Sequence, residues 1–141
     1  MMNFKLKMKP PTITAQEHQV TVKNGKPIFY DPPKLKNAKQ DLLGHLYQYQ
    51  PKEPYNEAVI LSVQWLFQSP LHHDGEWKTT KPDTDNLQKL LKDCMTRVGF
   101  WNNDALVVRE VVEKRWVRNA PGIVISIMTA AELKELEELA T

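Results

Sequence analysis

The sequence has little cysteine and no long apolar run. Its single cysteine, Cys94, excludes an internal disulfide framework and a zinc site built from cysteines, and it fits a reducing compartment. The first residues include lysines but no apolar stretch of signal-peptide length, and nowhere do roughly 18 apolar residues follow one another as a membrane-spanning helix requires. We therefore expect a cytoplasmic protein that does not enter a membrane.

Length and charge narrow the possible functions. The chain has 141 residues, so we expect one domain that spans residues 1–141, because a domain usually has about 100–200 residues. The net charge is only +2, but residues 1–52 carry nine lysines against three acids, and the tail after Ile127 is acidic. A basic face suits a polyanion, although scattered lysines also keep an ordinary surface soluble.

Apolar residues follow both strand and helix patterns along the chain. Period-two alternation, short apolar runs and the turn dipeptide Asn24-Gly25 predict strands, whereas helical spacing of leucines predicts helices. The expected strands are 4–9, 20–23, 28–30, 58–67, 105–116 and 123–128, and the expected helices are 34–49, 85–98 and 129–139. This mixture favours an α/β (α+β) fold with a mixed or antiparallel sheet packed against helices.

Turn and cap residues refine these expectations. We expect the strands 105–116 and 123–128 to pair antiparallel, and segment 69–85 to be an exposed loop. Thr84 or Asp85 can cap the helix that follows, and Gly99 should end it. At the carboxyl-terminal helix, Thr129 followed three residues later by a glutamate makes a capping box.

Carboxylates gather in the segments KPDTDNLQKLLKD and GFWNND. They stand at a loop-to-helix junction and just before a strand, where side chains from two elements can converge. Mg²⁺ and Mn²⁺ take oxygen ligands, so Asp83, Asp85 and Asp104 are candidate metal ligands. Lys89, one helical turn beyond Asp85, adds positive charge for a phosphate, and the four side chains together suit hydrolysis of a phosphodiester. As an alternative, an aspartate before a helix is commonly only a cap.

This motif resembles the signature of the RusA family of Holliday junction resolvases. That signature has Asp-x-Asp-Asn, a lysine one helical turn later, and acids after an aromatic-rich turn. The resemblance is best over residues 81–117 and extends loosely to the whole chain. It implies that Asp83 and Asp85 are the paired catalytic acids, Lys89 the motif lysine, and Asp104 the downstream acid.

The resemblance also implies an activity and an assembly. A member of this family is expected to be a homodimer that binds Mg²⁺, or Mn²⁺, and resolves four-way DNA by paired symmetric nicks in recombination and repair. Two-fold symmetry would present two equal sites to the two strands that must be cut. Prophage origin of the gene is a further expectation.

One position departs from the family pattern, because many members have two adjacent acids where this chain has Asn103-Asp104. Consecutive residues at the start of a strand point to opposite sides, so we predict Asp104 rather than Asn103 as the downstream ligand. The rival interpretation is a non-catalytic DNA-binding or architectural protein, such as a degenerate relative whose Asn103 has cost it activity.

Basic and aromatic side chains complete the candidate DNA-binding set. The three lysines on one face of the first expected strand, and a basic group near the end of a later strand, are candidate phosphate contacts: Lys5, Lys7, Lys9, Lys114, Arg115 and Arg118. The tryptophans at 77, 101 and 116 either stack on bases or, as is more usual, pack within the protein. His72 and His73 are interpreted as part of an exposed loop rather than as a metal site.

Overall fold

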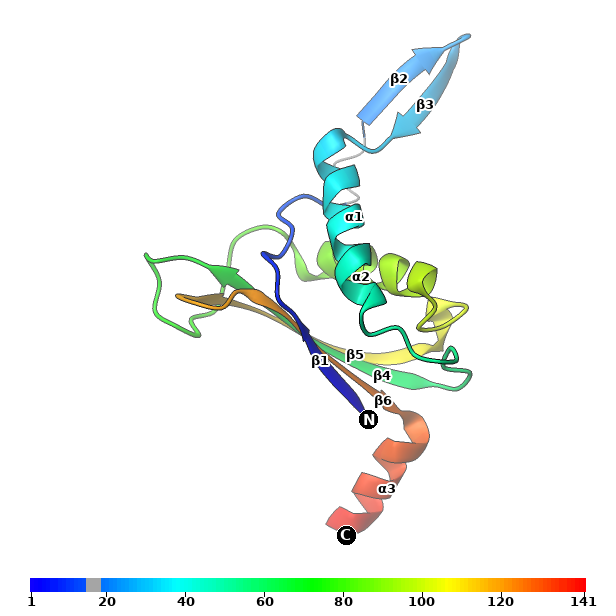
Figure 1. Cartoon of the computed structure of the whole chain (residues 1–141), viewed down its shortest axis with the longest axis vertical. Coiled ribbons are helices and arrows are strands. Elements are labelled where there is room, and N and C mark those ends of the chain that lie inside the picture. Colours follow the sequence, from blue (N-terminus) through cyan, green and yellow to red (C-terminus); the bar gives the residue numbers. More distant parts are fainter. Residues whose placement is uncertain (15–18) are drawn as a thin grey trace.

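The fold centres on a four-stranded sheet with the strand order β1-β6-β4-β5 (Figure 1). The structure is a computed structural model and describes residues 1–14 and 19–141. The strands of this sheet are β1 Met2–Leu6, β4 Val59–Gln68, β5 Val107–Val117 and β6 Gly122–Thr129. Strands β1 and β4 each pair antiparallel with β6, whereas β4 and β5 pair parallel. The predicted fold class, a mixed sheet with helices, is confirmed.

The pairing expected for the last two strands of the sheet is wrong. Strands β5 and β6 do not pair with each other, because β4 lies between them and pairs with both. The physical reason lies in the composition of β4, a mostly apolar run in which every second residue from Val59 to Phe67 is buried. A strand of this kind is most stable in the centre of a sheet, where both backbone edges are hydrogen-bonded.

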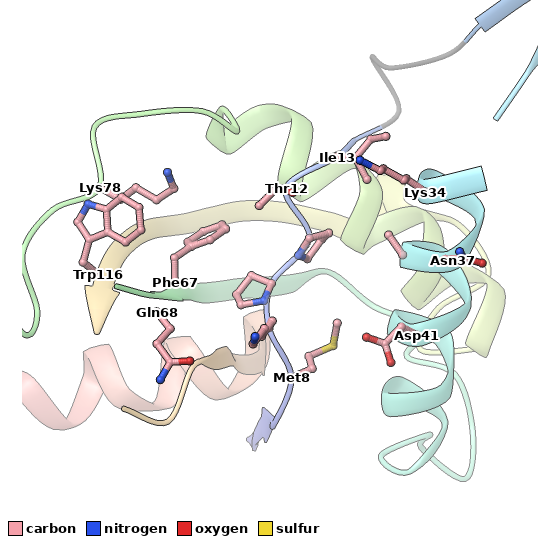
Figure 2. A pocket seen from close by; sticks show the side chains of 14 residues that line it. Met8, Thr12, Ile13, Lys34, Asn37, Asp41, Phe67, Gln68, Lys78 and Trp116 are labelled. Carbon is pink, nitrogen blue, oxygen red and sulfur yellow. The ribbon is translucent and has the colours of Figure 1, made fainter. Parts of the chain in front are cut away.

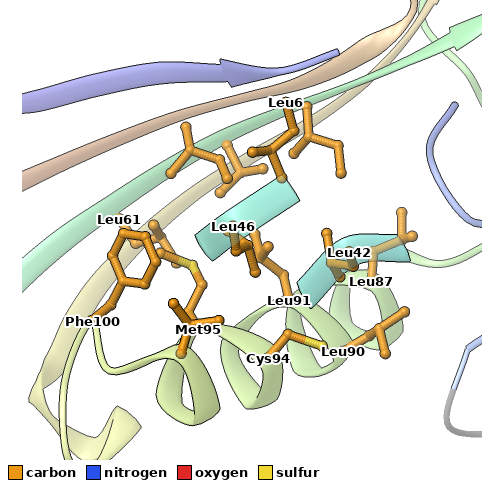
Figure 3. Packing of buried hydrophobic residues seen from close by; sticks show 14 of the residues in the cluster. Leu6, Leu42, Leu46, Leu61, Leu87, Leu90, Leu91, Cys94, Met95 and Phe100 are labelled. Atoms are coloured by element: carbon orange, nitrogen blue, oxygen red, sulfur yellow. The ribbon is translucent and has the colours of Figure 1, made fainter. Parts of the chain in front are cut away.

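Two helices cover one face of the sheet and close the core (Figure 3). They are α1 Pro33–Tyr47 and α2 Thr84–Val98. Leucines from both helices, among them Leu42, Leu46, Leu87 and Leu91, are fully buried against one another and against the sheet. Each leucine buried in this way contributes about 1.5–3 kcal/mol to the free energy of unfolding. The core therefore fixes how α2 lies on the sheet.

Both ends of α2 matter for its orientation. Asp83 occupies the N-cap position but its side chain makes no capping hydrogen bond, so the expectation that Thr84 or Asp85 caps the helix is wrong. The helix ends at Gly99, as predicted, which has a left-handed φ of 104° and donates its N–H to the carbonyls of Met95 and Thr96. Because no cap bond engages it, the Asp83 carboxylate is left for other partners.

Two further elements extend away from this core (Figure 1). The predicted hairpin is confirmed as β2 Gln19–Lys23 and β3 Lys26–Tyr30, a separate two-stranded sheet that turns at Asn24-Gly25. Helix α3, Ala130–Ala140, begins with the predicted capping box of Thr129 and Glu132, and none of its residues is buried. None of the helices in the described part of the chain has the length and apolar character needed to span a bilayer.

Most of the segment between β4 and α2 is exposed, as predicted, although part of it packs along the sheet. Leu71 is exposed, but residues 75–78 run along the free edge of β5. There the Gly75 N–H donates to the Trp116 carbonyl and the Trp116 N–H donates to the Glu76 carbonyl, each at 2.7 Å. Lys78 in this stretch is buried. Covering the edge satisfies backbone groups of β5 that would otherwise remain unpaired.

Candidate active site

A polar cavity of about 680 Å³ lies between α2 and β5. Four carboxylates line it: Asp85, Asp93, Asp104 and Glu110. They come from the helix, from the turn before β5, and from β5 itself, so the cavity depends on the tertiary packing of these elements. Two of the three aspartates predicted as metal ligands, Asp85 and Asp104, therefore line one cavity.

Helix α2 contributes a polar face to this cavity. Asp85, Gln88, Lys89 and Lys92 line it, and residues three and four positions apart lie on the same side of a helix. The opposite face carries the leucines of the core. The apolar stripe that holds α2 on the sheet thus also decides which polar side chains face the cavity.

Asp104 reaches the cavity from a short turn rather than from a strand. The strand expected from residue 105 begins only at Val107, and Asp104–Leu106 form a 3-10 helix. The side-chain oxygen of Asn103 accepts the backbone N–H of Ala105 at 2.8 Å, which caps this turn. Asp104 lines the cavity and Asn103 is not among its lining residues. Asp104 therefore faces the cavity because Asn103 caps the turn, and not through strand alternation, and its role as the downstream ligand stays a prediction.

Asp83 does not line the cavity, although it directly precedes α2. Within residues 1–14 and 19–141, no three acidic, histidine or cysteine side chains stand close enough together to hold a metal ion by themselves. Mg²⁺ usually keeps several water ligands and is bound by one or two carboxylates together with substrate phosphate. The oxygen donors of Asp85 and Asp104 fit a cation bound in that way.

The two lysines of the cavity differ in their partners. Lys92 forms an ion pair of 2.9 Å with Glu110, so these two charges largely neutralise each other. Lys89 is exposed and forms no ion pair within the described part of the chain. Its ammonium group is therefore free to meet an anion that enters the cavity.

Lys114 has a local role that the sequence did not reveal. Its ammonium group donates to the backbone carbonyls of Thr80 and Pro82, each at 2.8 Å. These two bonds tie the segment before Asp83 to β5. The same side chain was predicted as a phosphate contact, which stays a prediction, but in this structure it holds the approach to α2 in place.

Arg115 also makes contacts within the protein. It donates to the carbonyl of Gly75 at 2.9 Å and to the Glu113 carboxylate at 3.1 Å, and its guanidinium lies 3.7 Å from the ring centre of Trp77. Hydrogen bonds from Gln64 and then from Arg115 lower the pKa of Glu113. Trp77 is 57% exposed, so this arginine and tryptophan form an accessible basic and aromatic surface.

The remaining basic candidates lie on the surface. Lys5, Lys7 and Lys9 line one shallow depression together with Ala120 and Pro121. Lys5 donates to the Ala120 carbonyl at 2.9 Å, while Lys7 and Lys9 are exposed. Arg118 is exposed as well. The three lysines are thus gathered on one surface, but the strand expected over residues 4–9 ends at Leu6, so only Lys5 belongs to it.

Two of the three tryptophans considered for stacking on bases are already engaged. Trp101 is fully buried and donates to the Thr96 hydroxyl at 2.8 Å. Trp116 stacks on His72, with ring centres 4.4 Å apart, and carries the Lys78 ammonium 4.3 Å from its ring centre. Both therefore pack within the protein, and His72 is occupied in the same contact.

A second cavity, of about 730 Å³, lies where Lys78 meets Phe67 and Trp116 (Figure 2). The Lys78 ammonium donates to the Thr80 hydroxyl, and burial, followed by the charge of Lys114, lowers its pKa. Among the described residues, Asp41 is the one carboxylate that lines this cavity. A site with a single acid does not suit a hard cation, so the acidic cavity beside α2 is the candidate active site.

A cavity that combines several carboxylates with an unpaired lysine is the type of site that hydrolytic nucleases use. The chain belongs to the RusA endodeoxyribonuclease family, because the family model described as "Endodeoxyribonuclease RusA" matches residues 10–128. A protein of Lactococcus phage r1t named crossover junction endodeoxyribonuclease rusA is 33% identical over 103 residues, which cover 71% of this chain and 76% of that relative. The family resemblance inferred from the motif is confirmed.

Proposed function

We propose that this protein is a metal-dependent, structure-specific endonuclease that resolves four-way DNA junctions by paired symmetric nicks. The observation that carries the proposal is the acidic cavity, where Asp85, Asp104 and Lys89 meet in a chain of the RusA family. The name of the phage relative, a crossover junction endodeoxyribonuclease, supports the same substrate. The reaction would serve DNA recombination and repair.

Each side chain has a defined task in this proposal. Asp85 and Asp104 would hold Mg²⁺ or Mn²⁺, and Asp83, whose carboxylate makes no cap bond, is the third candidate ligand. When bound, the cation would polarise the scissile phosphate and lower the pKa of a water molecule. Lys89 would attract the phosphate and balance its negative charge in the transition state. The carboxylates alone would repel DNA, so this lysine also matters for binding.

The proposed assembly is a homodimer of one-domain chains in the cytoplasm. A symmetric junction needs two nicks, and a two-fold dimer offers two equal sites. Apolar side chains are exposed at two separate places that extend from the core, namely Val20, Val22 and Ile28 on the β2–β3 hairpin and Leu136 and Leu139 on α3, and each is a candidate partner surface (Figure 1). Exposed apolar side chains that cluster commonly mark association surfaces.

The rival function is a protein that binds branched DNA without cutting it. It is favoured by one observation, namely that no three candidate ligands are assembled in the described part of the chain. A nicking assay separates the two functions: the purified protein is mixed with a synthetic four-way junction and Mg²⁺, Mn²⁺ or Ca²⁺. We expect paired nicks with Mg²⁺ or Mn²⁺ and none in a linear duplex of the same sequence. Junction binding without nicks in any of these metals would establish the rival.

A further inference from the structure

Gln88 is a buried polar side chain in the wall of the acidic cavity. Only 3% of it is exposed, and its side-chain oxygen accepts the indole N–H of Trp65 at 2.9 Å. Its amide nitrogen Nε2 is inaccessible to solvent and has no hydrogen-bond partner among the described residues. A buried donor without a partner is rare in native proteins and calls for a physical explanation.

The orientation of this amide follows from the chemistry of Trp65. An indole N–H can only donate, so the oxygen of Gln88 must face it, and the two N–H bonds of the amide must point elsewhere. Trp65 is fully buried in the central strand β4, which makes the anchor rigid. The sheet therefore holds a neutral donor in a fixed orientation beside a set of carboxylates.

Asp85 is the carboxylate nearest to Gln88 along α2. It lies three residues before Gln88 on α2, and helical side chains lean toward the preceding turn. Both side chains line the same cavity. A neutral N–H can orient a carboxylate without cancelling its negative charge, which a lysine in the same place would do.

We propose that Gln88 is a positioning residue, which donates from Nε2 to the Asp85 carboxylate and holds it for the cation when the site is loaded. Carboxylates that bind metals are generally held by such outer hydrogen bonds, and loss of one lowers metal affinity or activity about 10–100-fold. The chain of contacts then runs from Trp65 through Gln88 to Asp85. This inference rests on the proposed metal-dependent function.

The test measures cation binding apart from cleavage. Gln88→Met keeps the volume of the side chain but removes the donor, and Mn²⁺ binding to the protein without DNA is followed by calorimetry. We expect the Kd for Mn²⁺ to rise about 10-fold or more, junction binding in the absence of metal to stay unchanged, and slowed cleavage to recover as Mg²⁺ is raised. Gln40→Met, at an exposed position of α1, is the matched control and should behave like the wild type.

A second variant protects the test against a simple folding defect. Trp65→Phe keeps an aromatic ring in the core but removes the N–H that orients Gln88, so Mn²⁺ affinity should fall by a smaller factor. If Trp65 acts on Asp85 only through Gln88, the double variant should bind Mn²⁺ no more weakly than Gln88→Met alone. A purely structural role would instead give additive effects that extra Mg²⁺ does not restore, and would overturn the inference.

The outcomes distinguish this inference from the proposed function. If the wild type binds Mn²⁺ and nicks junctions while Gln88→Met has the same Mn²⁺ affinity, the role of Gln88 is refuted and the nuclease function stands. If the wild type neither binds Mn²⁺ nor nicks junctions, the proposed function and the inference fail together. Weaker Mn²⁺ binding in Gln88→Met with recovery at high Mg²⁺ supports both.

Discussion

Asp85, in the first turn of α2, and Asp104, in the 3-10 turn before β5, line the same cavity. The two carboxylates come from elements that meet only in the folded chain. The neighbouring Asn103 is used to cap the turn that presents Asp104. This arrangement brings two carboxylates and Lys89 to one cavity, and it leads to predictions for each of the charged groups involved.

Removal of a candidate ligand charge should stop cleavage without preventing DNA binding. In Asp85→Asn and in Asp83→Asn we expect the cleavage rate to fall roughly 100-fold or more, since metal chemistry needs the carboxylates whereas lysines hold the phosphates. Cleavage of a labelled four-way junction and its binding in Ca²⁺ are the measurements. Asp41→Asn, on the exposed surface of α1, is the control. Wild-type cutting by either variant would remove that residue from the site.

Two substitutions distinguish the role of Asn103 from that of Asp104. Asp104→Asn should lose cleavage, most clearly at low metal concentration, because it removes a carboxylate from the cavity. Asn103→Asp should remain active, since an aspartate can also cap the turn, but its metal dependence should change. Both rates are titrated against Mg²⁺ and Mn²⁺. Full activity of Asp104→Asn at low metal would contradict the assignment.

Junction binding should weaken steeply with salt. Each phosphate contact contributes a slope of about −0.9 to the logarithm of the binding constant against the logarithm of salt concentration. Exchange of Lys5, Lys7 and Lys9 together for glutamine should therefore flatten the slope by about 2 to 3. Lys134→Gln, on exposed α3, should leave it unchanged. An identical slope in the triple variant would exclude these lysines from the DNA surface.

Lys114→Met should reveal whether this lysine acts inside the protein or on DNA. Loss of its bonds to Thr80 and Pro82 should lower the free energy of unfolding by about 1–2 kcal/mol and slow cleavage, because the segment before Asp83 loosens. Urea unfolding and the salt dependence of binding are measured together. Unchanged stability with a salt slope flatter by about 1 would show that it contacts phosphate instead.

Cys94 should be unreactive in the folded protein. Burial raises the pKa of its thiol to about 11, so the reactive thiolate is scarce at pH 8. We expect a thiol reagent to label it only after unfolding, which absorbance measurements can follow. The folded thiol keeps its proton above the usual pKa of 9.0, so its contribution to stability should decline as the pH rises from about 9 toward 11. Rapid labelling at pH 8 in native conditions would contradict this.

Local patterns in the sequence determined most of the helices and strands and revealed the family motif. The leucine spacing of α2, the stop at Gly99, the Asn24-Gly25 hairpin and the capping box at Thr129 depend on near neighbours along the chain, and all are confirmed. The same holds for the family, which was recognised from a short segment of acids and one lysine and is confirmed. Contacts within a few residues are what a linear pattern can express.

The tertiary structure alone decided which of these groups meet. Strand β4 lies between β5 and β6 because the most apolar strand is stabilised most by a central position in the sheet. The turn residues that connect β5 to β6 do not encode this strand order. The burial of Gln88 beneath the acidic cavity depends on Trp65, which lies in a distant part of the chain. Lys114 bonds to two backbone carbonyls whose position no periodicity encodes. Such contacts form only when elements pack, because side-chain partners far apart in the sequence are chosen by the shape of the whole core.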